Sequence, residues 1–437
     1  MIGRVLARPT FRFTETQLLV APALLIIVGL LTIFLVPRGD VAWSWSDIWV
    51  SLAYGGAILA MSLSFSLSGF RGDQILLPLT ATLAGLGLLM IQRLHPDLVA
   101  QDAGYAGLAE KQLIYIVIGL LVLWLTVIVR PLGLLRRYKY TWLLLSFGLL
   151  VSTIFLGSEI NGAKLWIQIG PFQAQPSEIV KVTMVIFLAG YLDDKRDLIG
   201  SSWRVGMLTL PPVPYLLPMS LMWLASLMVL VLQNDLGAAL LFFGVFLVML
   251  YVASGRAVYV VVGLLSFALA CWGAYQVFNR IGIRVQNWLD PWQDPLDVGY
   301  QQVQSDYALA SGGLFGTGLG SGRPTFIPAV HTDFIFSAIG EELGLLGTLA
   351  VLALYFLLVM RGFAIALRAR DSFARLVAAG LSSILALQTV IIIGGVVRLI
   401  PLTGITLPFV SYGGSSLLTN FLIVGLLLNI SGLHRRA

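Results

Sequence analysis

The sequence predicts an all-α polytopic membrane protein with about twelve transmembrane helices, each needing about 20 apolar residues. Hydrophobic residues occupy 58% of the chain and charged residues only 11%, whereas about a quarter of a soluble domain is charged. The mean hydropathy is +0.92. The charges are also unevenly placed, since residues 141–157 and 207–234 contain none. These observations exclude a soluble enzyme, a nucleic-acid-binding domain and any large domain outside the membrane.

The predicted helices follow from the apolar runs taken in order along the chain. The first run has no small-residue cleavage site after it, so we interpret it as a retained span. The runs lie at about 17–36, 48–69, 75–92, 113–129, 140–157, 176–192, 207–232, 237–253, 258–278, 333–360, 377–397 and 408–431.

The distribution of Lys and Arg predicts the orientation of these spans. An even number of spans places both termini on one side, and loops rich in Lys and Arg indicate the cytoplasm. Both tails, together with the loops at 130–139, 195–204 and 361–375, carry most of the cations. We therefore expect both termini in the cytoplasm. The net charge of +6 is explained by these loops and does not indicate a nucleic-acid partner.

One connection is much longer than the others and is expected on the external side. It runs from Arg280 to Thr332, and loops of this length are commonly functional. It contains two carboxylates four residues apart, Asp290 and Asp294, each followed by proline. Proline favours an extended backbone at the preceding residue, so each Asp is expected in a turn. Such a carboxylate either acts as a base for a sugar hydroxyl, holds a divalent cation, or only starts the turn.

The same connection contains a glycine-rich run from Ser311 to Gly322. The stretch Gly316–Gly320 is not a dinucleotide loop, because no strand precedes it and no βαβ unit surrounds it. We expect these glycines to let backbone amides approach phosphate or sugar oxygens. Simple flexibility of the connection is the alternative.

Ionisable residues at membrane depth mark further candidate positions. Asp333 begins the tenth span and either caps that helix or serves the site. Glu341 and Glu342 lie about two turns inside it, where acids are costly and indicate function or ion pairing. Arg398 follows the eleventh span, and our hypothesis is that it pairs with Glu341 or Glu342.

A second ionisable group begins the sixth span. Glu178 and Lys181 follow Pro176 and share one helix face, so they either pair with each other or point into a polar cavity. Asp235 lies in the break between the seventh and eighth spans.

These motifs, in this order, resemble the SEDS family (shape, elongation, division and sporulation proteins). The resemblance covers roughly residues 75–431. It rests on Asn161–Ile167 with Gln175–Glu178, on Gln233–Gly237, on the Asp-Pro pair with Gly299–Ser305, on His331–Phe336 with Glu341–Gly344, and on Pro401–Ser416. Asn234, Leu165 and Ala329 depart from the family pattern.

The resemblance implies a ten-helix core over residues 75–437, with its large external loop at about 280–332. Residues 1–74 would then form the cytoplasmic N-terminus and an extra two-helix hairpin. The implied protein lies in the bacterial cytoplasmic (inner) membrane and has an external active site. It would polymerise lipid II into glycan strands during cell elongation or division. Its implied partners are a class B penicillin-binding protein and membrane lipids. The resemblance implies no organic cofactor.

The resemblance also implies roles for individual residues. It gives the catalytic role to Asp294, with Asp290 as its neighbour and candidate metal ligand. Inversion in one step needs a base near the acceptor hydroxyl and positive charge near the leaving pyrophosphate, supplied by a divalent cation (Mg or Mn) or by Arg284, Lys164 or Lys181. The substrate-binding candidates are Lys164, Glu178, Lys181, Arg284, Gln301, Gln304, His331, Asp333, Glu341, Arg398 and Ser411.

Two other functions also fit the pattern. A flippase that translocates the lipid-linked precursor would suit the broken helices and the intramembrane charges of Glu178 and Lys181. A scaffold that only binds partners is the third reading. The long acid-bearing external loop favours the enzyme, because a transporter needs polar groups along a path rather than at one face.

Overall fold

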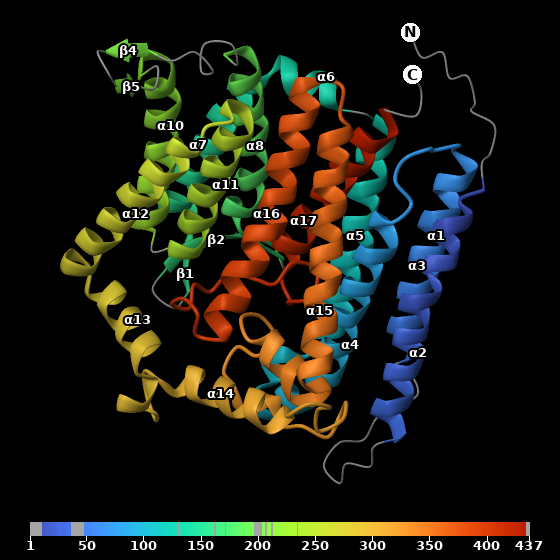
Figure 1. Ribbon diagram of the computed structural model, residues 1–437. Coiled ribbons are helices and arrows are strands. Elements are labelled where there is room, and N and C mark those ends of the chain that lie inside the picture. Colours follow the sequence, from blue (N-terminus) through green and yellow to red (C-terminus); the bar gives the residue numbers. More distant parts are fainter. Residues whose placement is uncertain are drawn as a thin grey trace. The chain divides into compact units, whose positions relative to one another are not determined.

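The computed structural model describes residues 11–35, 48–129, 131–160, 163–170, 172–195, 203–205, 208–210, 213–233 and 235–433 (Figure 1). The predicted all-α membrane fold is confirmed. Among the described residues, ten helical segments are long and apolar enough to cross a membrane. The two remaining predicted spans coincide with α8 (Pro176–Asp194) and α10 (Val213–Leu232), which are not among these ten. The number twelve therefore stays a prediction.

The chain forms two compact units, the first from residues 1–129, 286–361 and 392–437 and the second from 130–285 and 362–391. The predicted division near residue 74 is a different one and stays a prediction. Helices confined to the first unit are α1 (Phe13–Leu18), α2 (Val20–Leu35), α3 (Ile48–Leu67), α4 (Leu76–Gln101), α5 (Leu108–Val129), α14 (Tyr300–Gly312) and α17 (Gly414–Leu433), with short 3₁₀ turns η2 (Ala103–Tyr105), η3 (Pro291–Gln293) and η4 (Pro324–Phe326).

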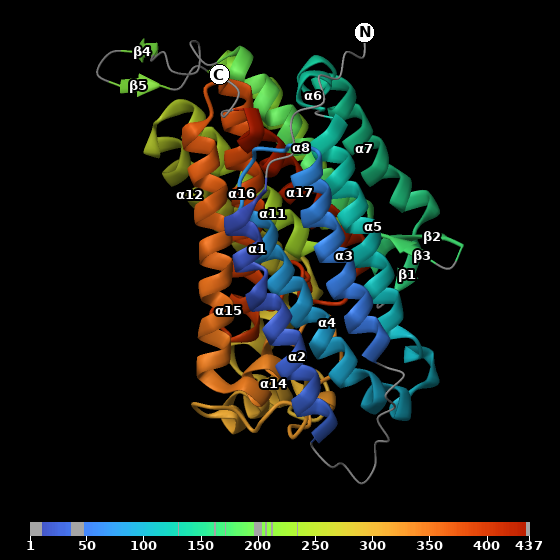
Figure 2. The same ribbon diagram turned by 90° about the vertical axis from the view of Figure 1, so that its right-hand side faces the viewer.

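The core of the first unit surrounds α4. In its most apolar stretch of 18 residues, 94% of the residues are buried. A helix surrounded by protein in this way is expected to be apolar on every face. It lies beside α2 and α3 in Figure 2, and α5 packs against both α4 and α17. Gly425 of α17 allows this approach, because a Cβ there would lie 3.1 Å from the Leu123 Cα atom.

The second unit contains α6 (Leu132–Arg137), α7 (Lys139–Leu156), α8, α10, α11 (Leu236–Ser254) and α12 (Ala257–Val277). Two small antiparallel sheets accompany them: β1 (Ser158–Ile160), β2 (Ala163–Ile169) and β3 (Phe172–Ala174) in that order, and β4 (Trp203–Val205) with β5 (Leu208–Leu210). Three further helices have residues in both units: α13 (Asn279–Leu289), α15 (Ile335–Arg368) and α16 (Ser372–Val396).

Two cations of one predicted cytoplasmic loop, 130–139, pair with acids at or near the two other loops of the second unit. Arg136 pairs with Asp193 at 2.8 Å and with Asp371 at 3.3 Å. Lys139 pairs with Asp194. The ends of α6, α8 and α16 are thereby joined, as expected if these loops lie on the same side of the membrane.

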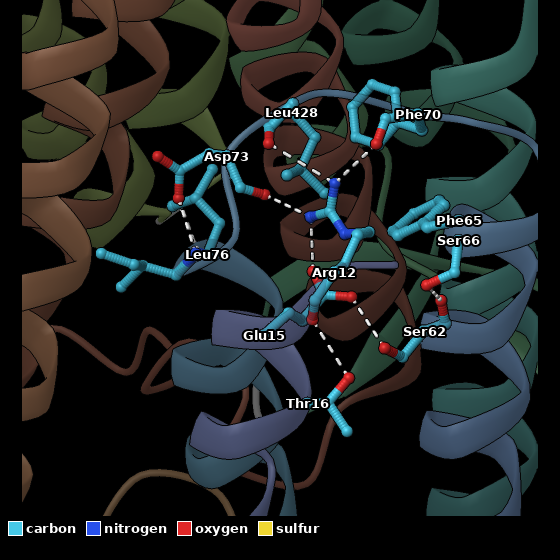
Figure 3. A network of polar contacts seen from close by, with 12 residues as sticks. Arg12, Glu15, Thr16, Ser62, Phe65, Ser66, Phe70, Asp73, Leu76 and Leu428 are labelled. Carbon is cyan, nitrogen blue, oxygen red and sulfur yellow. Dashed lines mark hydrogen bonds and ion pairs between the residues drawn. The ribbon is translucent and has the colours of Figure 1, made fainter. Parts of the chain in front are cut away.

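The extra N-terminal hairpin (α1 to α3) is anchored to the first unit by a buried polar network (Figure 3). Arg12 is only 1% exposed and pairs with Glu15, which is 0% exposed, at 2.5 Å. Its guanidinium also donates to the carbonyls of Phe70 and Asp73, and Ser62 donates to Glu15. In the sequence Arg12 is one of the cations of the N-terminal tail that indicate the cytoplasmic side. The structure shows that it is also a structural residue.

Asp73 connects this network to the helices of the core. Its carboxylate caps the start of α4 by accepting from the amides of Ile75 and Leu76, and it pairs with Arg361 of α15 at 2.5 Å. Its own amide donates to Ser431 of α17. The hairpin is therefore attached to a residue that already joins three other helices.

A Glu15→Gln variant is expected to lower the free energy of unfolding by about 1.5–3 kcal/mol, the usual range for a hydrogen bond to a charged group. The amide cannot neutralise the buried Arg12, although three backbone carbonyls still accept from it. Thermal unfolding in detergent measures the loss, and Gln17→Ala on the exposed side of α1 is the control. Equal stability of the two variants would contradict the proposed anchor.

Candidate functional site

The long connection from Arg280 to Thr332, predicted on the external side, is built from helices and tight turns. It contains α13 from Arg280 onwards, η3, α14 and η4. Asp290 has φ −145° and ψ 83°, and Asp294 has φ −138° and ψ 73°, so neither has the right-handed helical backbone that a following proline disfavours. The Asp290 side chain accepts from the Trp292 amide at 3.1 Å. The Asp294 side chain is exposed, and its carboxylate is therefore open to a ligand.

Asp294 is held at the end of a closed turn. Its carbonyl accepts from the Gly299 amide at 2.9 Å. A Cβ at Gly299 would lie 2.1 Å from the Pro291 carbonyl oxygen, so only glycine allows the chain to close here. Although Asp294 is exposed, its backbone is well defined by these contacts.

Arg398 lies against this segment, and the predicted pairing of Arg398 with Glu341 or Glu342 is wrong. Its guanidinium instead pairs with Asp306 of α14 at 3.2 Å. Glu341 accepts from the Arg323 amide at 2.7 Å. Several acids lie at similar sequence depth, and only the packing of α14 decides which of them reaches Arg398.

Glu342 is paired with Arg93 of α4. Both side chains are 0% exposed and their atoms are 2.8 Å apart. Arg93 also contacts Asp97 at 2.9 Å and the Gly322 carbonyl at 2.9 Å. A buried charge requires such partners. The acid within the predicted span is therefore explained by an ion pair, which was one of the two predicted outcomes.

The glycine-rich run contacts Glu341 and Glu342. The prediction that its amides face phosphate or sugar oxygens is therefore wrong for three of these amides. The amides of Thr317 and Gly318 donate to the carbonyls of Glu341 and Glu342, at 2.9 and 3.0 Å. The Gly320 amide donates to the Glu342 carboxylate at 3.1 Å. These bonds satisfy carbonyls that would otherwise be left unpaired where α15 breaks.

The break in α15 occurs at Gly344, whose φ is +67°. A Cβ at Gly344 would lie 2.3 Å from the Gly316 nitrogen, and one at Gly316 would lie 2.2 Å from the Glu342 carbonyl oxygen. Two backbones thus meet without side chains between them. The glycines serve this close approach rather than a ligand.

His331 lies between two tyrosines at the start of the tenth predicted span. The ring centroid of Tyr105 is 5.2 Å away and that of Tyr412 is 5.8 Å away. Burial lowers the pKa of His331 to about 4, so the imidazole is neutral at physiological pH. Its Nδ1 atom is buried and has no hydrogen-bond partner among the described residues. Burial, reinforced by Tyr115, raises the pKa of Tyr412 to about 12.

The Pro401–Ser416 motif packs beside His331. The Ser411 hydroxyl, 3% exposed, donates to the Thr332 carbonyl at 2.5 Å and accepts from the Leu407 amide at 2.9 Å. A Cβ at Gly404 would lie 3.7 Å from the Asp333 carboxylate. His331, Asp333 and Ser411 are thus brought together. The hydroxyl of Ser411 is occupied by the backbone, and its substrate contact stays a prediction.

Because of His331, the protein should become less stable as the pH is lowered. The imidazole of His331 takes up a proton only near pH 4 in the folded state, whereas it does so near pH 6.5 in the unfolded chain. Stabilisation is therefore present above about 6.5 and is lost as the pH falls through this window. Unfolding temperatures between pH 7 and pH 4.5 should drop more for wild type than for His331→Gln. The same pH slope in both proteins would contradict the assignment.

A second cluster lies within the second unit. Lys181 is 3% exposed, pairs with Glu178 at 2.5 Å and donates to Gln388 of α16 at 2.9 Å. Asp235 caps α11 by accepting from the Ala238 amide at 3.0 Å, and the Ser177 hydroxyl donates to it at 3.3 Å.

Asp235 links this cluster to Arg284. Burial raises the pKa of Asp235, and the negative charge of Glu178 acts in the same direction, whereas the positive charge of Arg284 opposes it. The structure therefore brings together Glu178, Lys181 and Arg284, with Asp235 beside them. The sequence predicted that Glu178 and Lys181 either pair with each other or point into a polar cavity. The pairing is confirmed.

The three remaining predicted substrate-binding residues lie on α14 and β2. Gln301 is exposed and Gln304 is half-buried on α14. Lys164 belongs to β2, where its backbone pairs with Glu159, and its side chain is outside the described residues. The buried glutamine of α14 is Gln302, which donates to Asp306 and to the Val396 carbonyl.

The described residues do not form a complete cation site. They contain no group of three or more His, Cys, Asp or Glu side chains placed to hold a metal, and one Asp290 oxygen is used by the Trp292 amide. The predicted Mg or Mn ion, and Asp290 as its ligand, stay predictions.

Sequence reasoning missed Asp306, Gln302 and Arg93. Asp306 and Gln302 follow the Gly299–Tyr300 start of α14 at helical spacing, and Arg93 comes directly after the third predicted span. Its only signal was its position, within one turn of the apolar run at 75–92. A charge so close to an apolar run is a candidate for burial.

Fold and site together define a polytopic helical membrane protein with a structured, acid-bearing segment between α12 and α15. A family model described as a cell cycle protein, for FtsW, RodA and SpoVE, matches residues 74–436. The peptidoglycan glycosyltransferase RodA of Mycobacterium tuberculosis is 43% identical over 440 residues, covering 98% of this chain and 92% of the relative. The chain therefore belongs to the FtsW/RodA/SpoVE family, which confirms the predicted SEDS membership.

Solved structures are similar as well, two of which follow. A chain from a peptidoglycan synthase complex that coordinates polymerization and crosslinking has 32% identity and a TM-score of 0.67, over 84% of this chain and 98% of that one. The rod shape determining protein RodA of Thermus thermophilus has 30% identity and a TM-score of 0.58, over 84% and 97% of the respective chains.

Proposed function

We propose that this chain is a peptidoglycan glycosyltransferase that polymerises lipid II into glycan strands. The observation that carries the proposal is the 43% identity, over nearly the whole chain, to a RodA that bears this activity in its name. The exposed carboxylate of Asp294, on a turn with a defined backbone, supplies a chemical group suited to the reaction.

In the proposed reaction Asp294 is the general base. It takes the proton of the acceptor sugar's 4-hydroxyl while that oxygen bonds to the anomeric carbon of the donor. The bond from this carbon to the pyrophosphate breaks in the same step, and the configuration inverts. A base at hydrogen-bond distance contributes about 10²–10⁴-fold.

The leaving pyrophosphate needs positive charge. Lys181 is poorly suited, because its ammonium is already bound by Glu178 and Gln388. The roles of Arg284 and Lys164 at the pyrophosphate stay predictions.

The proposal includes a location and a partner. Both termini are cytoplasmic and the Asp294 segment is external. The ion pairs of Arg136 and Lys139 with acids near the two other predicted cytoplasmic loops support a common side for these loops. A class B penicillin-binding protein is the proposed cross-linking partner, because a similar chain belongs to a peptidoglycan synthase complex.

Purified protein in liposomes tests the function. Labelled lipid II is supplied to wild type and to Asp294→Ala, each with and without a class B penicillin-binding protein, and glycan polymer is separated on a gel. We expect polymer from wild type alone or with the partner, and little from the variant. No polymer from wild type, together with passage of the precursor across the vesicle bilayer, would instead support a flippase.

A further inference from the structure

Arg398 has an unusual backbone conformation. Its φ is +60°, a left-handed value that costs a residue with a side chain about 1–3 kcal/mol and persists only where surrounding contacts enforce it. Glycine would adopt this conformation without strain. The arginine side chain is therefore expected to do something at this position that glycine cannot.

The side chain caps the end of α13. Its Nη2 atom donates to the carbonyls of Trp288 and Leu289, both at 3.2 Å. These carbonyls belong to the last turn of α13, where no helical partner remains and a cation is favourable. In return, the Trp288 indole donates to the Arg398 carbonyl at 2.9 Å. The two residues hold each other through side chain and backbone.

A second layer fixes the direction of the guanidinium. Its Nη1 atom pairs with Asp306 at 3.2 Å. Gln302 donates to Asp306 at 3.3 Å and to the Val396 carbonyl at 3.0 Å. Asp306 is thus oriented from α14, while Val396, two residues before Arg398, is held by the same glutamine. The planar fork of arginine is suited to two such partners at once, and lysine is not.

The capped end of α13 leads directly to the candidate base. Leu289 precedes Asp290, η3 follows, and Asp294 ends this turn, where its carbonyl accepts from Gly299. The turn is therefore held at both ends, by Arg398 before it and by Gly299 after it. We propose that Arg398 is a positioning residue, which sets the place of Asp294 through the end of α13. This inference rests on the proposed function and replaces direct substrate contact as the role of Arg398.

Arg398→Gly is the informative variant, because it removes the guanidinium and also relieves the strained backbone. Hydrogen exchange of the amides in 286–299 is expected to rise by tenfold or more. The kcat for lipid II polymerisation is expected to fall about 10- to 100-fold, as when a reacting group is displaced by about 1 Å. The KM should stay within twofold. Arg398→Lys should recover part of the kcat, because its ammonium still reaches Asp306 but not both carbonyls.

Arg323→Ala is the matched control, since it removes an exposed arginine from the same external segment; it should leave exchange and kcat unchanged. The double variant Arg398→Gly/Asp294→Asn should be no slower than Asp294→Asn alone. Unchanged exchange in Arg398→Gly, or a rise in KM at constant kcat, would overturn the proposal. If Asp294→Asn keeps wild-type turnover, the proposed base is wrong, while the exchange measurement still decides whether Arg398 holds the turn.

Discussion

Asp294→Asn is expected to reduce lipid II polymerisation by about 10²–10⁴-fold, the contribution of a well-placed general base. The amide has nearly the same shape as the carboxylate but cannot accept a proton at neutral pH. Because the side chain is exposed, the free energy of unfolding should change by less than about 0.5 kcal/mol. Initial rates with labelled lipid II, beside unfolding temperatures of the same preparations, separate catalysis from stability.

Asp297→Asn is the matched control for this result. It makes the same change of charge three residues further along the same exposed stretch, so any general effect of charge on the substrate would appear in both variants. We expect Asp297→Asn to remain within about threefold of wild type. Equal losses in the two variants would show that local charge, and not a base at position 294, supports the reaction.

The second large effect is expected at the ion pair of Arg93 and Glu342. Arg93→Met should lower the free energy of unfolding by about 3–5 kcal/mol, because it leaves a buried carboxylate without its cation. Both side chains are 0% exposed, and of the bonds described to Glu342 the Gly320 amide would remain. Unfolding of the purified protein in detergent measures the loss.

A double-mutant cycle separates pairing from packing. Arg93→Met/Glu342→Leu should recover a large part of the lost stability, since an apolar pair of similar volume is often as stable as a buried ion pair. Arg71→Met removes an exposed arginine of the same unit and should have little effect. Additive losses in the double variant would contradict coupling between the two residues.

The sequence predicted local features well where local sterics or hydropathy control them. The non-helical backbone of Asp290 and Asp294 follows from the prolines after them, and the structure confirms it at both residues. The pairing of Glu178 with Lys181 follows from helical spacing, although the bond of Lys181 to Gln388 brings in a helix about 200 residues away. Such long-range contacts lie outside any local pattern.

The errors share one cause. Several acids at similar depth could have paired with Arg398, which pairs with Asp306. The amides of the glycine-rich run could have donated either to a ligand or to the protein itself, and the Gly320 amide donates to Glu342. In each case composition identified a group in need of a partner but could not choose the partner. That choice depends on which helices pack together, as with α14 beside Arg398.

The sequence by itself determined that this chain crosses the membrane many times, belongs to the SEDS family and carries a long acid-bearing connection. Apolar runs and ordered motifs are enough for this, because hydropathy and backbone sterics act over a few residues. Only the tertiary structure decided that Arg12 anchors the hairpin, that Arg93 neutralises Glu342, and that Arg398 caps the helix leading to Asp294. A buried charge must be paired, and its partner is whichever group the folded chain brings within hydrogen-bond distance.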